Sequence, residues 1–167
     1  MATYKKYTVR LARKRNRKTD YKARLRLLVS RKPRLVIRKS NNKIYLQLVK
    51  YDTKGDQILY YLDSSKLRSY GWKYKLNNLP SCYLAGLLFG LEVKKQKINE
   101  AILDLGLNIS VYGSSLYSTL KGVIDSGLNV PYDKKVLPSE DRIKGEHILD
   151  YSLKLKNSDL LRGFLNT

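Results

Sequence analysis

Residues 34 to 49, RLVIRKSNNKIYLQLV, alternate apolar and polar positions on either side of an Asn-Asn pair. A period of two predicts two β-strands joined by a hairpin turn. We expect Asn41 and Asn42 to be the turn residues, because Asn tolerates the left-handed conformation that a tight hairpin demands. The resulting register pairs Ser40 with Lys43, Arg38 with Tyr45, Ile37 with Leu46 and Val36 with Gln47.

The two faces of this hairpin differ in chemistry. One is apolar and predicts a buried face: Leu35, Ile37, Ile44, Leu46 and Leu48. The other carries cations, an amide and an aromatic ring: Arg34, Arg38, Lys43, Tyr45 and Gln47. Arg pairs with phosphate in a bidentate manner, and Tyr can stack on an unpaired base or pack on ribose. We expect this polar face to be an open surface that binds nucleic acid.

Helical periodicity brackets the hairpin. Upstream, Thr19 is the expected N-cap of a helix that runs to about Ser30. Downstream we expect a third strand, QILYYLD, and a short helix that ends near Gly71. A longer helix follows, capped by Ser81, with Gly86 and Gly90 placed for close packing on a sheet. Three more elements complete the pattern: a buried strand in EAILDLGLNI, an amphipathic helix in SSLYSTLKGVIDSGL and one charged helix from Ser139. The order predicts an α/β fold, a mixed sheet with an antiparallel meander and helices packed on it.

Charge is large and uneven. The net charge is +20, and residues 1 to 54 hold 19 Lys or Arg against two acids, Asp20 and Asp52. Such a segment repels itself unless a polyanion neutralises it. Residues 1 to 18 hold eight cations and no acid, which predicts a basic arm that is extended and orders only on its partner. An anionic membrane surface is the alternative, but few bulky apolar residues face these cations, so nucleic acid is favoured.

Chemistry-bearing clusters are scarce. Cys82 is the only cysteine and His147 the only histidine, so neither a disulfide nor a clustered metal site is expected. The apolar run from Cys82 is too short for a bilayer, and the N-terminus has no apolar signal region. We therefore expect a cytoplasmic protein with no membrane partner, no cofactor and no small-molecule substrate.

A nuclease is the enzymatic alternative. A meander followed by helix and strand resembles ribonuclease H topology, in which carboxylates on strands hold two metal ions. The first strand here, residues 34–40, carries no carboxylate, and Asp104 alone cannot build such a site. We interpret Asp104, Asp125 and Glu92 as ion-pair partners or solvated residues, and expect no enzyme. A non-specific nucleic-acid-compacting protein remains a further alternative.

Six segments together resemble a known family: KTDYKARLRLL, KPRLVIRKSNNKIYLQLV, YGWKYKLNNLPSCYLAGLLFGLE, EAILDLGL, LKGVIDSGLNVP and RIKGEHI. They fall in order over about residues 4 to 153 and are similar to large-subunit ribosomal protein eighteen in its archaeal form. The resemblance implies a ribonuclease H-like, non-catalytic fold and binding of 5S rRNA. It also implies contacts with the large rRNA and with neighbouring ribosomal proteins in the central protuberance of the large subunit.

The resemblance and the pattern together divide the chain into a basic RNA-binding arm (1–18), a globular 5S rRNA-binding domain (19–153) and a C-terminal tail (154–167). The predicted RNA-binding residues lie in the arm, the first helix and the hairpin. They are Lys5, Lys6, Arg10, Arg13, Arg15, Arg17, Arg24, Arg26, Arg34, Arg38, Ser40, Asn41, Lys43, Tyr45 and Gln47.

Overall fold

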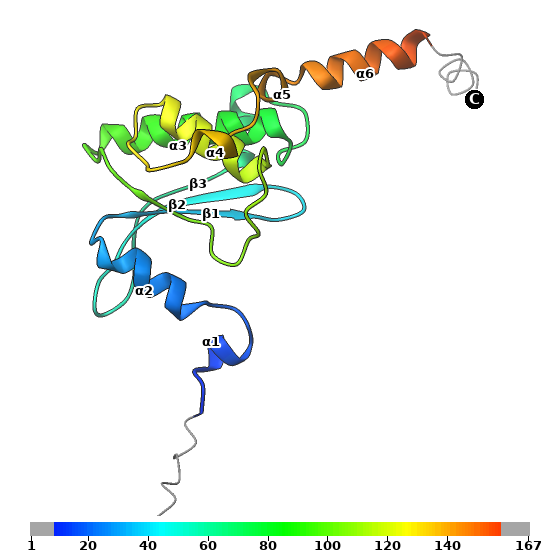
Figure 1. Ribbon diagram of the computed structural model, residues 1–167. Helices are drawn as coiled ribbons and strands as arrows, with labels where there is room; N and C mark the ends of the chain where they lie inside the picture. Colours follow the sequence, from blue (N-terminus) through cyan, green and yellow to red (C-terminus); the bar gives the residue numbers. More distant parts are fainter. Residues whose placement is uncertain (1–8, 158–167) are drawn as a thin grey trace, which may run out of the picture.

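A mixed sheet separates a thick helical layer from a thin one (Figure 1). The structure is a computed structural model that describes residues 9–157. Within these residues four strands lie in the order β3-β2-β1-β4, with β4 parallel to β1 and the other pairs antiparallel. This confirms the predicted α/β class and the meander. The strands are β1 (Arg34–Lys39), β2 (Ile44–Lys50), β3 (Gln57–Asp63) and β4 (Ile102–Asp104).

The hairpin between β1 and β2 has the predicted register, with Arg38 opposite Tyr45 and Ile37 opposite Leu46. The predicted left-handed Asn turn is wrong, because neither Asn of the turn has a positive φ. Ser40 closes the turn instead. Its amide and its hydroxyl each donate to the Lys43 carbonyl at 2.9 Å, and its Oγ accepts from the Lys43 amide at 3.1 Å. A side-chain oxygen thus supplies hydrogen bonds that a strained backbone would otherwise have to make.

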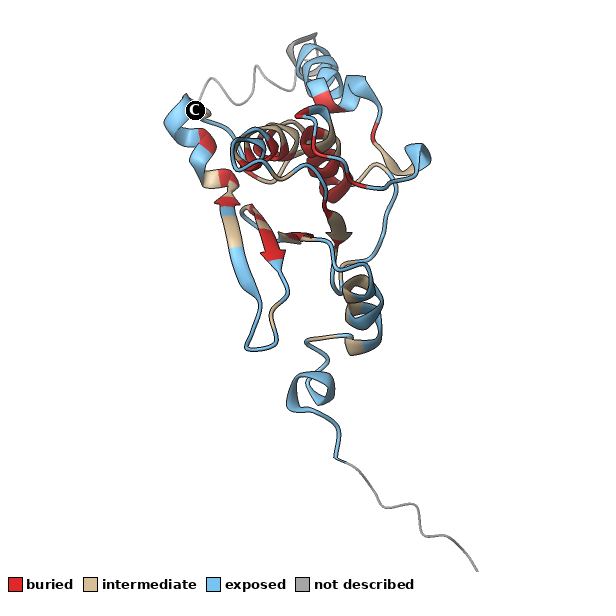
Figure 2. Cartoon of the chain, turned by 90° about the vertical axis from the view of Figure 1, so that its left-hand side faces the viewer, coloured by how far each residue is buried: buried red, intermediate tan, exposed pale blue. Residues whose placement is uncertain are grey.

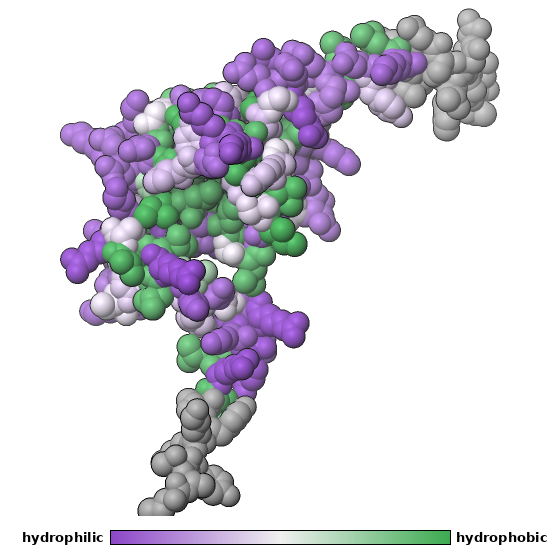
Figure 3. All heavy atoms as spheres, in the orientation of Figure 1, coloured by the Kyte–Doolittle hydropathy of each residue, from purple (hydrophilic) through white to green (hydrophobic). Residues whose placement is uncertain are grey.

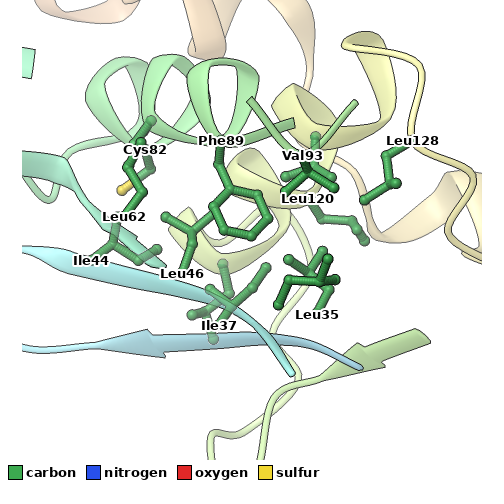
Figure 4. Close-up of a cluster of buried hydrophobic side chains, with 14 of the residues drawn as sticks. Leu35, Ile37, Ile44, Leu46, Leu62, Cys82, Phe89, Val93, Leu120 and Leu128 are labelled. Atoms are coloured by element: carbon green, nitrogen blue, oxygen red, sulfur yellow. The ribbon is translucent and has the colours of Figure 1, made fainter. Parts of the chain in front are cut away.

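The core lies between the sheet and two helices, α3 (Leu79–Lys95) and α4 (Ser115–Asp125). Figure 2 shows the buried residues gathered on this side. All five residues of the predicted apolar face are fully buried, and Phe89 of α3 packs on them (Figure 4). Alternate residues of one hairpin therefore form the side of the core that the sheet contributes.

Gly86 and Gly90 permit close packing, as predicted, but the predicted packing partner, the sheet, is wrong. These glycines face α4 rather than the sheet, and a Cβ on Gly86 would lie 2.1 Å from the carbonyl oxygen of Thr119. A contact this close admits no side chain, so Gly86 permits the two helices to touch backbone to backbone.

Helix ends differ from the prediction where a better cap is adjacent. Asp20, not Thr19, caps α2 by accepting from the amides of residues 22 and 23. Asn78, not Ser81, caps α3. The single helix expected after Ser139 is two helices, because Gly145 is left-handed (φ +87°) and ends the first.

The remaining elements are α1 (Ala12–Arg15), α2 (Tyr21–Val29), η1 (Ser64–Tyr70), η2 (Lys134–Val136), α5 (Glu140–Lys144) and α6 (Glu146–Asn157).

The N-terminal and C-terminal regions extend from opposite sides of the core (Figure 1). The expectation of a wholly extended arm is wrong at α1, whose four residues form a helical turn. Residues 9 to 18 are all exposed, so this part adds nothing to the core. Lys5 and Lys6, and the tail from residue 158, lie outside the described residues. Helix α6 projects from the body with its side chains exposed through residue 154.

Candidate nucleic-acid interface

The polar face of the sheet, defined by Arg34, Val36, Arg38, Tyr45, Gln47 and Asp104, is not the open surface that the sequence predicts. Helix α2 lies beneath it (Figure 1). Arg34 is only 4% exposed. The expectation that Arg34 stands free for RNA is therefore wrong, and its guanidinium has a structural environment instead.

Two carboxylates hold Arg34. One terminal nitrogen donates to Asp104 Oδ2 at 2.8 Å, and the other donates to Asp56 Oδ2 at 2.6 Å. Asp56 also accepts from Arg24 of α2. One terminal nitrogen of that guanidinium, Nη2, lies 2.9 Å from each carboxylate oxygen of Asp56. Since Asp56 bridges β1 and α2, and since no residue of α2 is buried, these charges position the helix on the sheet.

Arg38 has a divided role. It donates to Asp104 Oδ1 at 3.0 Å and to the carbonyl oxygens of Asp104 and Ile37 at 2.6 and 2.8 Å. Its side chain is nevertheless 41% exposed. A guanidinium has five N–H donors, so Arg38 keeps donors for a ligand while it is anchored. Asp104 is an ion-pair partner, as predicted.

The other two acids that we interpreted as ion-pair partners or solvated residues also pair on the surface. Asp125 binds Lys121 at 2.7 Å, and Glu92 binds Lys95 at 2.8 Å. Both pairs lie within single helices and away from the polar face.

At the end of the hairpin, Lys43 is 2.7 Å from Asp63 and 5.5 Å from the centroid of the Tyr45 ring. Burial alone would raise the pKa of the Asp63 carboxyl. The Lys43 ammonium and the Ser65 amide outweigh burial, so this pKa lies below its usual value. Asp63 in turn raises the pKa of Lys43, chiefly through their hydrogen bond. Asn41 is exposed at the tip, and its carbonyl accepts from the side chain of Asn77.

Exposed cations concentrate on the arm and α2. Figure 3 shows hydrophilic side chains gathered there, below the body of the molecule. Among residues 9–157, eight exposed cations of this region have no acidic partner: Arg13, described below, and seven others. They are Arg10, Lys14, Arg15, Arg17, Lys18, Lys22 and Arg26. Arg13 donates to Thr19 at 2.9 Å, which ties the arm to the start of α2.

A cleft of about 860 Å³ lies between α2 and the polar face, and we name it the α2 cleft. It brings together predicted residues from three elements: Arg13 of the arm, Arg24 and Arg26 of α2, and Arg34, Arg38 and Gln47 of the hairpin. Tyr45, Lys43, Ser40 and Asn41 lie outside it. Asp56 and the segment 105–108 also line it, and neither was predicted, because their proximity arises only from tertiary packing.

The described residues offer little else for chemistry. Residues 9–157 contain no group of three or more His, Cys, Asp or Glu side chains placed to hold a metal ion. Cys82 is buried, and burial raises the pKa of its thiol to about 11. In the same part of the chain no helix has the length and apolar character needed to cross a bilayer.

The sequence of this chain is similar to known proteins over most of its length. Residues 5–100 match the family described as ribosomal large subunit proteins 60S L5 and 50S L18. The chain is 46% identical over 161 residues to the large ribosomal subunit protein uL18 of Korarchaeum cryptofilum, covering 96% of this chain and 83% of that protein. It is 45% identical over 152 residues to the large ribosomal subunit protein uL18 of Methanothrix thermoacetophila, covering 91% and 90%. Since the family model matches residues 5–100 and both relatives match along nearly the whole chain, the protein belongs to this family of large ribosomal subunit proteins.

Proposed function

We propose that the protein binds 5S rRNA and helps to anchor it to the large rRNA in the central protuberance, beside neighbouring ribosomal proteins. One observation carries the proposal. The exposed cations of α1 and α2 have no acidic partner among residues 9–157, whereas both arginines of the adjacent strand β1 are paired with Asp56 or Asp104. Lys and Arg that displace counterions from phosphates supply most of the affinity for nucleic acid.

The arrangement divides the candidate residues into two groups. Arg24 and Arg34 share Asp56 and position α2 on the sheet. Residues with free donors make the contacts to RNA: Arg10, Arg13, Arg15, Arg17, Arg26 and the exposed part of Arg38. Lys5 and Lys6 extend the same basic arm (1–18), and residues 19–153 form the binding domain.

The hairpin tip provides a second kind of contact. Asn41 is exposed, and Ser40, Lys43 and Tyr45 are half-buried beside it, while Gln47 lies further along β2 and lines the α2 cleft. Short amide and hydroxyl groups suit 2′-hydroxyls, and the Tyr45 ring offers a surface for ribose or an unpaired base. The tip therefore adds discrimination of RNA shape to the charge of the arm.

We further infer a ribonuclease H-like fold without its catalysis. The strand order β3-β2-β1-β4, with β4 parallel to β1, supports this class. Both Asp104 carboxylate oxygens are bonded, Oδ2 to Arg34 and Oδ1 to Arg38 and to the Gly106 amide at 2.9 Å. A carboxylate so engaged by cations is a structural ion-pair partner, and β1 supplies arginines where a two-metal site needs acids.

Competition binding tests the proposal. Labelled 5S rRNA bound to the protein at moderate salt is challenged with unlabelled 5S rRNA, another structured RNA of similar length, or duplex DNA. We expect 5S rRNA to compete at least about ten-fold better than either rival, a difference of about 1.4 kcal/mol. Equal competition by duplex DNA would establish the non-specific compacting protein instead. Incubation of the same RNA with Mg²⁺ tests the nuclease alternative, and protein-dependent cleavage would establish it.

A further inference from the structure

The α2 cleft has the size of a ligand site rather than a packing defect. Its volume of about 860 Å³ lies within the range of about 300–1,000 Å³ typical of pockets for small molecules and cofactors. One wall is α2, another is the polar face of the sheet, and a third is the segment 105–108.

The interior of the cleft is mixed in character. Val36 and Val49, 8% and 4% exposed, provide apolar surface on the sheet, and Leu27 provides it on α2. Gln47 lies directly across from Val36 and adds a carboxamide, which can both donate and accept hydrogen bonds. Apolar walls with the Gln47 amide match a nucleobase, which has flat apolar faces and a polar edge; the second amide of the cleft, Asn108, donates to the Leu105 carbonyl at 2.9 Å.

The charges of the cleft favour an anion. Six cations and three carboxylates line it, and each carboxylate is engaged. Asp20 caps α2, Asp56 holds Arg24 and Arg34, and Asp104 holds Arg34 and Arg38. The other cations, Arg13, Lys18 and Arg26, have no acidic partner among residues 9–157. All three are exposed and are available to a phosphate.

We propose that the α2 cleft receives one unpaired nucleotide of the bound RNA. The base packs on the valine surface with its edge on Gln47, and its phosphates bind Arg26 and Lys18. This inference rests on the proposed function, since it names the part of the RNA that the site takes. A paired base cannot enter, because its faces are stacked and its edge is occupied, whereas unpaired RNA bases are splayed out and held by proteins in this manner.

The test fills the cleft without removing a charge. Ala23 is exposed and lines the cleft from α2, so Ala23→Trp places a large ring in it. Val29 lies on the same helix, is 76% exposed and does not line the cleft, so Val29→Trp is the matched control. Affinity for 5S rRNA and chemical probing of each nucleotide are measured for both variants and the unchanged protein.

We expect the unchanged protein and Val29→Trp to protect one unpaired nucleotide that Ala23→Trp leaves reactive. Affinity should fall about ten-fold for Ala23→Trp only, the scale of one base contact. A 5S rRNA that is abasic at that nucleotide should bind the unchanged protein about ten-fold more weakly, and Ala23→Trp should weaken it no further.

The outcomes separate the two proposals. If Ala23→Trp binds with unchanged affinity and footprint, or if both variants weaken binding equally, the cleft takes no nucleotide while 5S rRNA binding stands. If the unchanged protein shows no preference for 5S rRNA, the proposed function fails and this inference fails with it.

Discussion

Ile37 and Arg38 are consecutive residues of β1, yet they belong to two regions held together by different forces. Ile37 is fully buried on the core face against α3 and α4. Arg38 lies on the polar face and is held by the carboxylate and the carbonyl of Asp104. The core face is stabilised by non-directional burial, and the polar face by a few directed charge contacts.

The difference separates stability from positioning. Burial of apolar surface contributes in proportion to area, whereas a buried ion pair loses in desolvation much of what it gains in attraction. We therefore expect the ion pairs of Arg34 to add little to the net free energy of unfolding. Their geometry instead fixes α2, and with it the exposed cations, relative to the hairpin.

Removing Asp104 should have the largest effect. Asp104→Ala leaves Arg34 buried with one partner and Arg38 with none of its carboxylate contacts, and breaking a buried pair costs about 3–5 kcal/mol of unfolding free energy. Denaturant unfolding measures it, with Asp125→Ala as the control, because that surface pair should contribute less than about 1 kcal/mol. Equal losses for the two variants would mean that the polar face is no more ordered than an ordinary surface.

Ile37→Ala should cost about 2–5 kcal/mol of unfolding free energy, since it leaves a cavity in the core. RNA affinity per folded molecule should not change, because the side chain lies on the other side of the sheet from the arginines. Unfolding and 5S rRNA binding are measured on the same preparation. A loss of affinity at full folding would show that the two faces are coupled.

Arg38→Ala should affect both properties. From the sequence alone the side chain stands free, and its removal is expected to change stability by about 0.5 kcal/mol. Because the structure shows three hydrogen bonds from Arg38, we expect its removal to lower the free energy of unfolding by about 1–2 kcal/mol. This value is already reduced to allow for the partial exposure of the side chain to water. RNA binding should weaken by about 1–3 kcal/mol. If the variant unfolds readily while its RNA affinity is retained, Arg38 is purely structural.

Arg26→Ala should leave stability within about 0.5 kcal/mol, since Arg26 is exposed and has no acidic partner among residues 9–157. RNA affinity should fall, and the slope of log affinity against log salt should decrease by about one. Lys134→Ala, at an exposed cation of η2, is the control and should change neither. An unchanged slope for Arg26→Ala would exclude a phosphate contact.

The smallest expected effect is the response of the hairpin tip to acid. Because the folded pKa of Asp63 lies below its unfolded value of about 4, its ion pair stabilises the protein above that value. The contribution disappears as the pH falls through the folded pKa. Asp63→Asn should therefore have a lower Tm than the unchanged protein at pH 7, and the two Tm values should converge in strong acid. A Tm difference that is the same at pH 7 and pH 3 would contradict this.

What could be predicted was local in the sequence. The hairpin register follows from alternation, and the amphipathic helix α4 follows from helical spacing. Charge counts alone indicated a polyanionic partner. Each of these properties is decided by residues within about ten positions of one another.

What could not be predicted depends on partners distant in the chain. Alternation places Arg34 on the polar face correctly, but its burial depends on Asp104, 70 residues away. The partner of Gly86 is the backbone of Thr119 and not the sheet, a choice that helix periodicity cannot reveal. The break at Gly145 was open to prediction, since Gly commonly ends helices, and the charged pattern on both sides obscured it.

The parallel pairing of β4 with β1 has a consequence for biosynthesis. The chain emerges N-terminus first, so Arg34 leaves the ribosome 70 residues before Asp104 does. Until the crossover through α3 is complete and this high-contact-order pairing closes, Arg34 and Arg38 lack their Asp104 carboxylate. A nascent or truncated chain therefore lacks both Asp104 ion pairs of β1 until the last strand is in place.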